Sequence, residues 1–323
     1  MIIHVFTLLA ALTAVIFAAH RAVMGAASVA RHLNVSPLLI GLTIVSLGTS
    51  IPEIFIATLA AQAGNPDLAL GNIIGSNIAN IALVLGATAV IMPLTFQSKL
   101  LKRELPLLFI FALLNYCVAF DGVGRGDSVF MLIILILFMI WQIRTAFTEE
   151  FDGEFEKELK TSLPDTLPLN KAGIYLAIGL MVLVISAKLL VWSATNIAHL
   201  LGVEEWIIGL TVVAITSSLP ELVIAISSVL RKEDDLAIGN MIGSSIYNLL
   251  LAYPLTGIIA PEKLLTIALR RDFPIMLGFI AILFFLGRGL GFSQGVINRW
   301  QGGILLLAYI SYLWSIYQSV IIL

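Results

Sequence analysis

Two segments in the two halves of the chain have nearly the same sequence, and this duplication constrains the fold more than any other feature. Seven of thirteen positions are identical between GLTIVSLGTSIPE (41–53) and GLTVVAITSSLPE (209–221). Seven of ten are identical between GNIIGSNIAN (71–80) and GNMIGSSIYN (239–248), and the offset is 168 residues in both cases. A constant, ungapped offset indicates an internal duplication, so the chain is expected to fold as two related halves.

The composition places the chain in a bilayer. Of its 323 residues 59% are hydrophobic and 12% are charged, with a mean hydropathy of +1.03, whereas a soluble domain carries about 25% charged residues. Apolar stretches of about 20 residues, long enough to span a membrane as helices, recur along the chain. The first of them is expected to be a span and not a signal peptide. A net charge of −2 argues against a nucleic-acid partner, and the single cysteine, Cys117, excludes an internal disulfide.

The pattern predicts an all-α polytopic membrane protein with ten transmembrane helices in two inverted five-helix repeats. The first repeat is 1–147 with its motif at 41–80, and the second is 172–323 with its motif at 209–248. An acidic loop, 148–171, divides them. An odd number of helices starts the second repeat on the opposite side, as in many secondary transporters. The helices are expected near 2–29, 37–61, 68–92, 104–120, 128–147, 172–197, 205–230, 236–260, 273–290 and 300–322.

The basic residues predict the orientation. Twelve Lys and Arg residues fall on the side opposite the N-terminus and four fall on the N-terminal side. Basic residues are in excess in cytoplasmic loops. The protein is therefore expected in the inner or plasma membrane, with both termini outside and the 148–171 loop in the cytoplasm.

A proline followed by a glutamate lies inside an apolar run in each repeat. Pro52 precedes Glu53, and Pro220 precedes Glu221. Each proline leaves the carbonyl four residues earlier without its helical partner, and a mid-membrane carboxylate costs about 2.5–3.5 kcal/mol. A single such glutamate could serve as a protonated strut. Two at equivalent positions beside proline instead favour an ion site, with the helix break supplying oxygens.

Oxygen-bearing side chains surround both glutamates at helical spacing. Asn72, Ser76 and Asn80 share a helical face, as do the equivalent residues of the second copy. With two carboxylates and no nearby thiolate or imidazole, this is a donor set for hard cations such as Ca²⁺. A lone hydroxyl can instead bond a backbone carbonyl. Asn72 and Asn240 could be helix clamps or ligands.

The aspartates just ahead of the second block have a different expected role. Asp67 and Asp235 keep the 168-residue offset of the motifs. Aspartate is among the preferred N-cap residues. They are expected to cap the helices that carry the second block.

The paired motifs G-x-T-x-x-x-x-x-T/S-S-x-P-E and G-N-x-x-G-S-x-x-x-N resemble the α-repeats of the calcium/cation antiporter superfamily, prokaryotic sodium/calcium exchanger branch. The resemblance extends from the first helix to the last and implies alternating access with Ca²⁺ and Na⁺ as transported ions. It implies no cofactor and no obligate protein partner. It also implies that Glu53 and Glu221 are carboxylates that bridge the ions. The implied side-chain ligands are Thr49, Ser50, Ser76, Asn80, Ser217, Ser218, Ser244 and Asn248. The backbone carbonyls of Ser46 and Ala214 are implied as further ligands.

The chain departs from the family pattern in its second copy. Gly48-Thr49-Ser50 becomes Thr216-Ser217-Ser218, and Asn248 stands where some relatives have aspartate. The missing acid disfavours a potassium-dependent exchanger, and the Pro-Glu form favours sodium over protons. A proton/Ca²⁺ antiporter of the same fold remains the nearest alternative. A passive cation channel and an intramembrane enzyme are more distant ones.

Overall fold

The computed structural model describes residues 2–33, 35, 37–96, 101–148, 167–200, 207–261, 265–288 and 295–321. These residues are almost entirely helical. The one sheet in this part of the chain is a short antiparallel pair, β1 (Leu94–Thr95) with β2 (Val296–Ile297). Most of the predicted acidic loop, 149–166, lies outside the described residues.

The helices, with π-helical turns labelled η, follow in chain order. They are α1 (Ile2–His32), α2 (Pro37–Ile40), η1 (Gly41–Val45), α3 (Ser46–Gln62), α4 (Pro66–Ala79), η2 (Asn80–Leu85), α5 (Gly86–Ile91), α6 (Leu101–Ala119), α7 (Arg125–Thr148), α9 (Leu169–Leu200), η3 (Ile208–Val213), α11 (Ala214–Ser217), α12 (Leu219–Val229), α13 (Asp234–Tyr247), η4 (Asn248–Ala252), α14 (Tyr253–Ile259), η5 (Ala268–Asp272), α15 (Phe273–Arg288) and α16 (Arg299–Ile321).

Helical residues occupy every one of the ten ranges predicted from hydropathy, with ends that differ by a few residues. Within the described residues, 7 helices are both long and apolar enough to cross a membrane by length and composition. These seven exclude α6, α15 and α16. The all-α polytopic membrane fold is confirmed.

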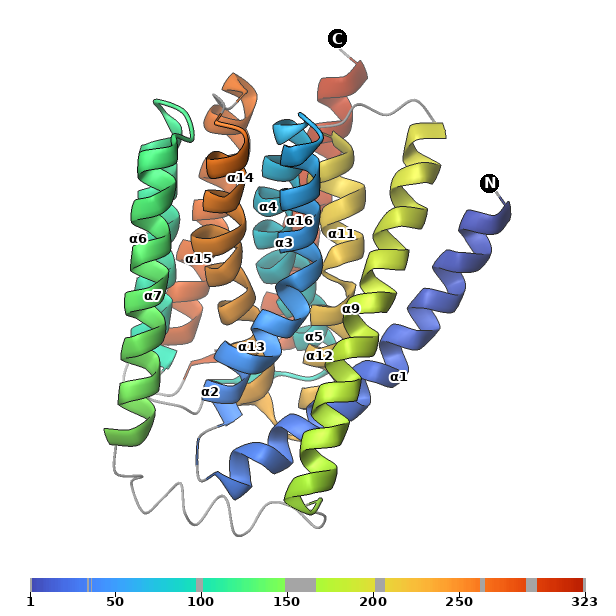
Figure 1. Cartoon of the computed structure of the whole chain (residues 1–323), viewed down its shortest axis with the longest axis vertical. Coiled ribbons are helices and arrows are strands. Elements are labelled where there is room, and N and C mark those ends of the chain that lie inside the picture. The colour runs from blue at the N-terminus through green and yellow to red at the C-terminus, as the bar shows by residue number, and fades with distance from the viewer. Residues whose placement is uncertain are drawn as a thin grey trace.

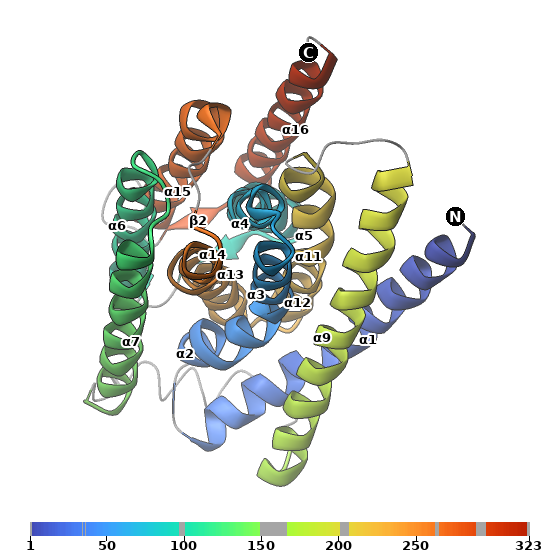
Figure 2. The ribbon, with the colours of Figure 1, turned by 45° about the horizontal axis from the view of Figure 1, so that its top comes forward.

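The first helices of the two halves lie side by side and run in opposite directions. Figure 1 and Figure 2 show α1 descending from the N-terminal end while α9 ascends beside it. Their backbones approach closely, since a methyl group on Gly25 would lie 2.7 Å from the Ala172 carbonyl oxygen, and one on Gly179 would lie 2.7 Å from the Ala22 nitrogen. The chain also begins and ends at the same end of the molecule (Figure 1).

The inner helices pack reciprocally across the two halves. The turn η1 of the first half packs on α13 of the second, and η3 packs on α4. A methyl group on Gly41 would lie 2.8 Å from the Leu236 carbonyl oxygen, and one on Gly209 would lie 2.5 Å from that of Leu68. Both pairs are related by the 168-residue offset, so the duplicated sequence forms a duplicated packing contact.

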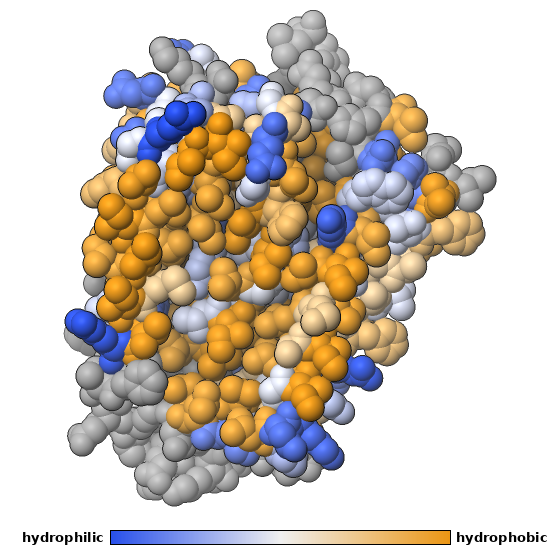
Figure 3. Space-filling view, in the orientation of Figure 1, coloured by the Kyte–Doolittle hydropathy of each residue, from blue (hydrophilic) through white to orange (hydrophobic). Residues whose placement is uncertain are grey.

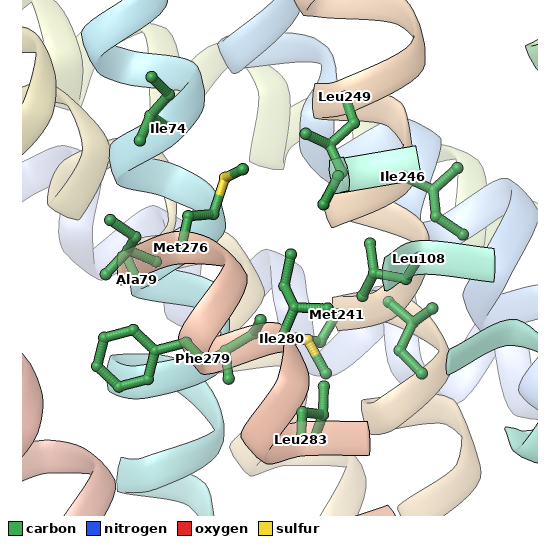
Figure 4. Close-up of a cluster of buried hydrophobic side chains, with 14 of the residues drawn as sticks. Ile74, Ala79, Leu108, Met241, Ile246, Leu249, Met276, Phe279, Ile280 and Leu283 are labelled. Atoms are coloured by element: carbon green, nitrogen blue, oxygen red, sulfur yellow. The ribbon is translucent and has the colours of Figure 1, made fainter. Parts of the chain in front are cut away.

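The main hydrophobic core lies among the inner helices and α6 and α15. Figure 4 shows Ile74 of α4, Leu108 of α6, Met241 of α13 and Ile280 of α15 directed into one cluster. The α1–α9 pair is built around a separate core that includes Val15 and Ala22 of α1 and Leu183 of α9. The molecule therefore has an inner bundle and an outer helix pair.

Large apolar side chains cover the outside of the bundle. Phe17, Ile133, Ile178 and Trp314 are exposed. On the face seen in Figure 3, apolar residues fill the middle while hydrophilic ones gather towards the two ends. An exposed apolar surface between polar ends is what a bilayer accommodates.

The predicted N-caps of α4 and α13 are wrong. Asn65, not Asp67, caps α4, because the Leu68 N–H donates to Asn65 Oδ1 at 3.2 Å. Glu233, not Asp235, stands at the N-cap position of α13, without a side-chain cap bond. The two aspartates lie in the first helical turns, where a negative charge is favourable beside the helix dipole. Pro66 moves the start of α4 one residue ahead of Asp67.

Candidate cation site

The residues singled out by the two motifs come together in the interior of the bundle. They are carried by α3 and α4 from the first half and by α11, α12 and α13 from the second. Ser218 lies between α11 and α12, and Asn80 and Asn248 begin the π-helical turns η2 and η4. None is more than 1% exposed: Ser46, Thr49, Ser50, Glu53, Ser76, Asn80, Ala214, Ser217, Ser218, Glu221, Ser244 and Asn248.

Hydroxyl groups from one repeat meet hydroxyl and amide groups from the other. Thr49 Oγ1 lies 3.1 Å from Ser244 Oγ and donates to Asn240 Oδ1 at 3.2 Å. The equivalent contacts place Ser217 Oγ 3.3 Å from Ser76 Oγ. Each motif therefore completes its polar cluster with residues of the other half.

The amide of the first repeat makes the matching contacts. Ser217 Oγ donates to Asn72 Oδ1 at 3.4 Å, and Ser76 Oγ donates to the same oxygen at 3.4 Å. Asn72 and Asn240 are fully buried. Both therefore accept hydroxyl hydrogen bonds across the repeat boundary, an arrangement the sequence left open.

The two carboxylates lie within this polar cluster. Ser244 Oγ donates to Glu221 Oε1 at 3.4 Å, and the hydroxyl of Ser217 lies beside Glu53. The two carboxylates are close enough to interact electrostatically. Two repeat-equivalent glutamates thus face one interior region.

Several buried oxygens of the cluster have no hydrogen-bond partner among the described residues. They form matched pairs from the two repeats: Glu53 Oε2 and Glu221 Oε2, Ser50 Oγ and Ser218 Oγ, Asn80 Oδ1 and Asn248 Oδ1. Buried polar atoms are almost always hydrogen-bonded, and each exception calls for an explanation. Oxygens left without partners in symmetric pairs fit a cation.

The backbone around the prolines differs between the repeats. Helix α3 runs on through Pro52, whereas the second copy is interrupted at Ser218 (φ −82°, ψ 1°) between α11 and α12. The carbonyl oxygens of Ser46 and Ala214 lie 3.2 and 3.4 Å from the hydroxyl oxygens of Thr49 and Ser217. Those two carbonyls therefore border the polar cluster.

Sequence reasoning missed the π-helical turns. The turns η1 and η3 directly precede the residues at 46 and 214, and η2 and η4 begin at Asn80 and Asn248. Such turns occur frequently at functional sites. Glycine was the available signal, because Gly41 and Gly209 open the first pair of motifs at points of close backbone contact.

The chemistry of the cluster is that of a hard-cation site. Its donors are carboxylate, hydroxyl, amide and carbonyl oxygens. Among the described residues there is no group of three or more His, Cys, Asp and Glu side chains that could hold a metal ion. Soft thiolate and imidazole ligands select transition metals, while oxygen donors suit Ca²⁺ and related ions.

Sequence comparison finds relatives over nearly the whole chain. A family model described as sodium/calcium exchanger protein matches residues 3–144 and 171–318. CaxA of Alkalimonas amylolytica is 40% identical over 320 residues, covering 99% of this chain and 100% of that protein. The inner membrane protein YrbG of Escherichia coli (strain K12) is 35% identical over 303 residues, covering 90% and 93%.

A solved structure has the same fold. The sodium-calcium exchanger NCX_Mj superposes with a TM-score of 0.80 at 28% identity, covering 97% of this chain and 99% of that one. The match in sequence, the duplicated motifs and the superposition agree. The chain belongs to the sodium/calcium exchanger family, in the prokaryotic branch of the calcium/cation antiporters.

Proposed function

We propose that this protein exchanges Ca²⁺ for Na⁺ across the membrane by alternating access. One observation carries the proposal: Glu53 and Glu221, equivalent residues of an inverted pair of motifs, each keep a buried carboxylate oxygen without a partner among the described residues. A membrane-embedded carboxylate is costly. A bound cation would offset that cost at both positions at once.

The proposed ligands are the residues that the resemblance to the exchanger family implies. Glu53 and Glu221 would bridge the ions. Hydroxyl and amide oxygens would complete the coordination, supplied by Thr49, Ser50, Ser76, Asn80, Ser217, Ser218, Ser244 and Asn248, together with the carbonyls of Ser46 and Ala214. This set is larger than the six to eight ligands of one Ca²⁺, so it can provide overlapping sites for more than one ion.

The balance of charge between the two glutamates and the bound ions would couple the movement of Ca²⁺ to that of Na⁺. Two ionised glutamates carry a charge of −2, which one Ca²⁺ neutralises. The empty site would then cross between its two access states poorly, and the loaded site readily. Exchange follows because the ions, and not the empty protein, favour the transition.

The membrane arrangement is also proposed. Ten helices would cross the inner or plasma membrane as two inverted repeats, 1–147 and 172–323, with 148–171 in the cytoplasm and both termini outside. The opposite directions of α1 and α9 and the shared end of the two termini support the inversion (Figure 1). The excess of basic residues on one side supports the orientation.

The test is ⁴⁵Ca²⁺ uptake into proteoliposomes loaded with Na⁺, compared with vesicles loaded with choline at the same pH. Uptake that requires internal Na⁺ and persists when the proton gradient is collapsed is expected. Uptake that follows an imposed proton gradient without Na⁺ would replace sodium with protons as the coupling ion. Equal uptake with no counter-ion gradient would indicate a channel.

A further inference from the structure

Two buried amides lie beside the candidate cation site and accept hydrogen bonds from its hydroxyls. We propose that Asn72 and Asn240 are positioning residues: each accepts the hydrogen of neighbouring hydroxyls, so that the lone pairs of those hydroxyls are available to the cation. This inference rests on the proposed function only in taking Ca²⁺ as the bound ion. It assigns a role to residues outside the ligand set above.

The physical requirement comes from the hydroxyl group itself. A Ser or Thr hydroxyl has one hydrogen and two lone pairs. A hydroxyl that binds a cation must direct a lone pair at the ion and its hydrogen away from it. In a buried site that hydrogen needs a fixed acceptor, because an unmade buried hydrogen bond is costly.

The structure provides such an acceptor in each half. Asn72 Oδ1 accepts from Ser76 Oγ of its own helix and from Ser217 Oγ of the other repeat, both at 3.4 Å. Asn240 Oδ1 accepts from Thr49 Oγ1 at 3.2 Å. These hydroxyls belong to the proposed ligand set. The Ser46 and Ala214 carbonyls, which lie 3.2 and 3.4 Å from the Thr49 and Ser217 hydroxyl oxygens, are proposed ion ligands themselves, so the amide oxygens are the acceptors that the ion leaves free. One amide oxygen thus orients ligands that come from both repeats.

The remaining atoms of the two amides argue against a helix clamp. The Nδ2 groups of Asn72 and Asn240 have no partner among the described residues. A helix clamp would use them to bond a neighbouring backbone. In Asn72 the two hydroxyls also take both lone pairs of Oδ1, which a direct ligand would keep for the ion. Asn77 shows the contrast, since its Nδ2 donates to the Ile73 carbonyl of its own helix at 2.8 Å.

The experiment measures Ca²⁺ binding to the purified full-length protein, by the Ca²⁺ concentration that gives half-maximal thermal stabilisation. Asn72→Leu removes the acceptor at similar size and is expected to raise that concentration about tenfold. Asn72→Asp keeps acceptor oxygens at the same place and is expected to bind Ca²⁺ at least as tightly as the wild type. The control Asn77→Leu, on the same helix and equally buried, is expected to leave the concentration within about twofold.

A double-mutant cycle separates positioning from packing. If Asn72 acts through Ser76 and Ser217, adding Asn72→Leu to the Ser76→Ala/Ser217→Ala protein changes the half-maximal Ca²⁺ concentration by less than about twofold. A full tenfold change in that background would overturn the inference, as would an Asp variant that folds but binds as poorly as the Leu variant. A wild type that is stabilised by Ca²⁺ yet shows no Na⁺-driven uptake would overturn the exchange proposal alone.

Discussion

The two repeats supply the same polar residues from different backbones. In the first, α3 is continuous from Ser46 to Gln62 with Pro52 inside it. In the second, the helix breaks at Ser218, and Pro220 lies in the first turn of a new helix, α12. Both arrangements place a buried glutamate and buried hydroxyls against the other half. What the repeats share is therefore the set of side chains and their cross-repeat contacts, not the continuity of the helix.

The turns that follow these helices show a second difference. Gly64 (φ 76°) and Lys232 (φ 61°) occupy equivalent positions and both have left-handed backbones. The next positions are Asn65, which caps α4, and Glu233, which forms an ion pair with Arg31 of α1. The residue after this turn thus caps α4 in the first repeat, whereas in the second repeat it forms an ion pair with α1.

The largest effect is expected from removing the carboxylate that one of the two repeats contributes to the site. Glu53→Gln and Glu221→Gln each remove one charge from the −2 site, and a single remaining carboxylate no longer neutralises Ca²⁺. Na⁺-dependent ⁴⁵Ca²⁺ uptake is expected to fall at least about 100-fold in each variant, with a folded, membrane-inserted protein, because charged-ligand interactions are worth several kcal/mol in buried sites. Robust exchange by the double variant would refute the site assignment.

The second-largest effect is expected from substituting the glycines at which the two repeats contact each other. A methyl group on Gly75 would lie 2.5 Å from the Leu210 carbonyl oxygen, and one on Gly243 would lie 2.7 Å from that of Leu42. Gly75→Ala and Gly243→Ala are expected to destabilise the protein by about 1–3 kcal/mol each through overpacking, measured as a lower Tm. Gly278→Ala is the control, since its methyl group meets nothing within 4 Å; a similar loss there would contradict the explanation.

Substitution of the two prolines tests whether the continuous helix of the first repeat and the broken helix of the second differ in stability. Pro52 lies in a helix interior, where proline costs about 3 kcal/mol relative to alanine. Pro52→Ala is expected to raise the Tm while slowing uptake, because the Gly48 carbonyl regains its helical bond. Pro220→Ala should change the Tm little, since proline in a first turn loses no helical bond. Equal changes in Tm for the two variants would show that the break at Ser218 has no energetic consequence.

The smallest effect concerns the two left-handed turn residues. A left-handed backbone costs a residue with a Cβ roughly 1–2 kcal/mol. Lys232→Gly is therefore expected to stabilise the protein by about 1 kcal/mol, and Gly64→Ala to destabilise it by a similar amount. Chemical denaturation of both variants checks the pair of opposite signs. A loss of stability in Lys232→Gly would mean that the lysine side chain makes a larger contribution than its backbone strain.

Local sequence properties determined the class and the helical ranges of this protein, and they predict its paired site residues. Hydropathy is sufficient to place helices, because a bilayer requires runs of apolar residues. The duplication predicts Glu53 and Glu221 together as site residues, since a proline–glutamate pair in each apolar run is difficult to explain without a compensating ion. The family match and the superposition with NCX_Mj confirm this class and this fold.

Other features depend on residues that are distant in the sequence. The π-helical turns, the reciprocal fit of Gly41 and Gly209, and the acceptor role of Asn72 arise only when the halves pack against each other. The cap of α4 is Asn65 and not the predicted Asp67, because Pro66 sets where that helix begins. Hydropathy and motif spacing describe one helix at a time, whereas a polar cluster completed by the other repeat is decided by tertiary packing.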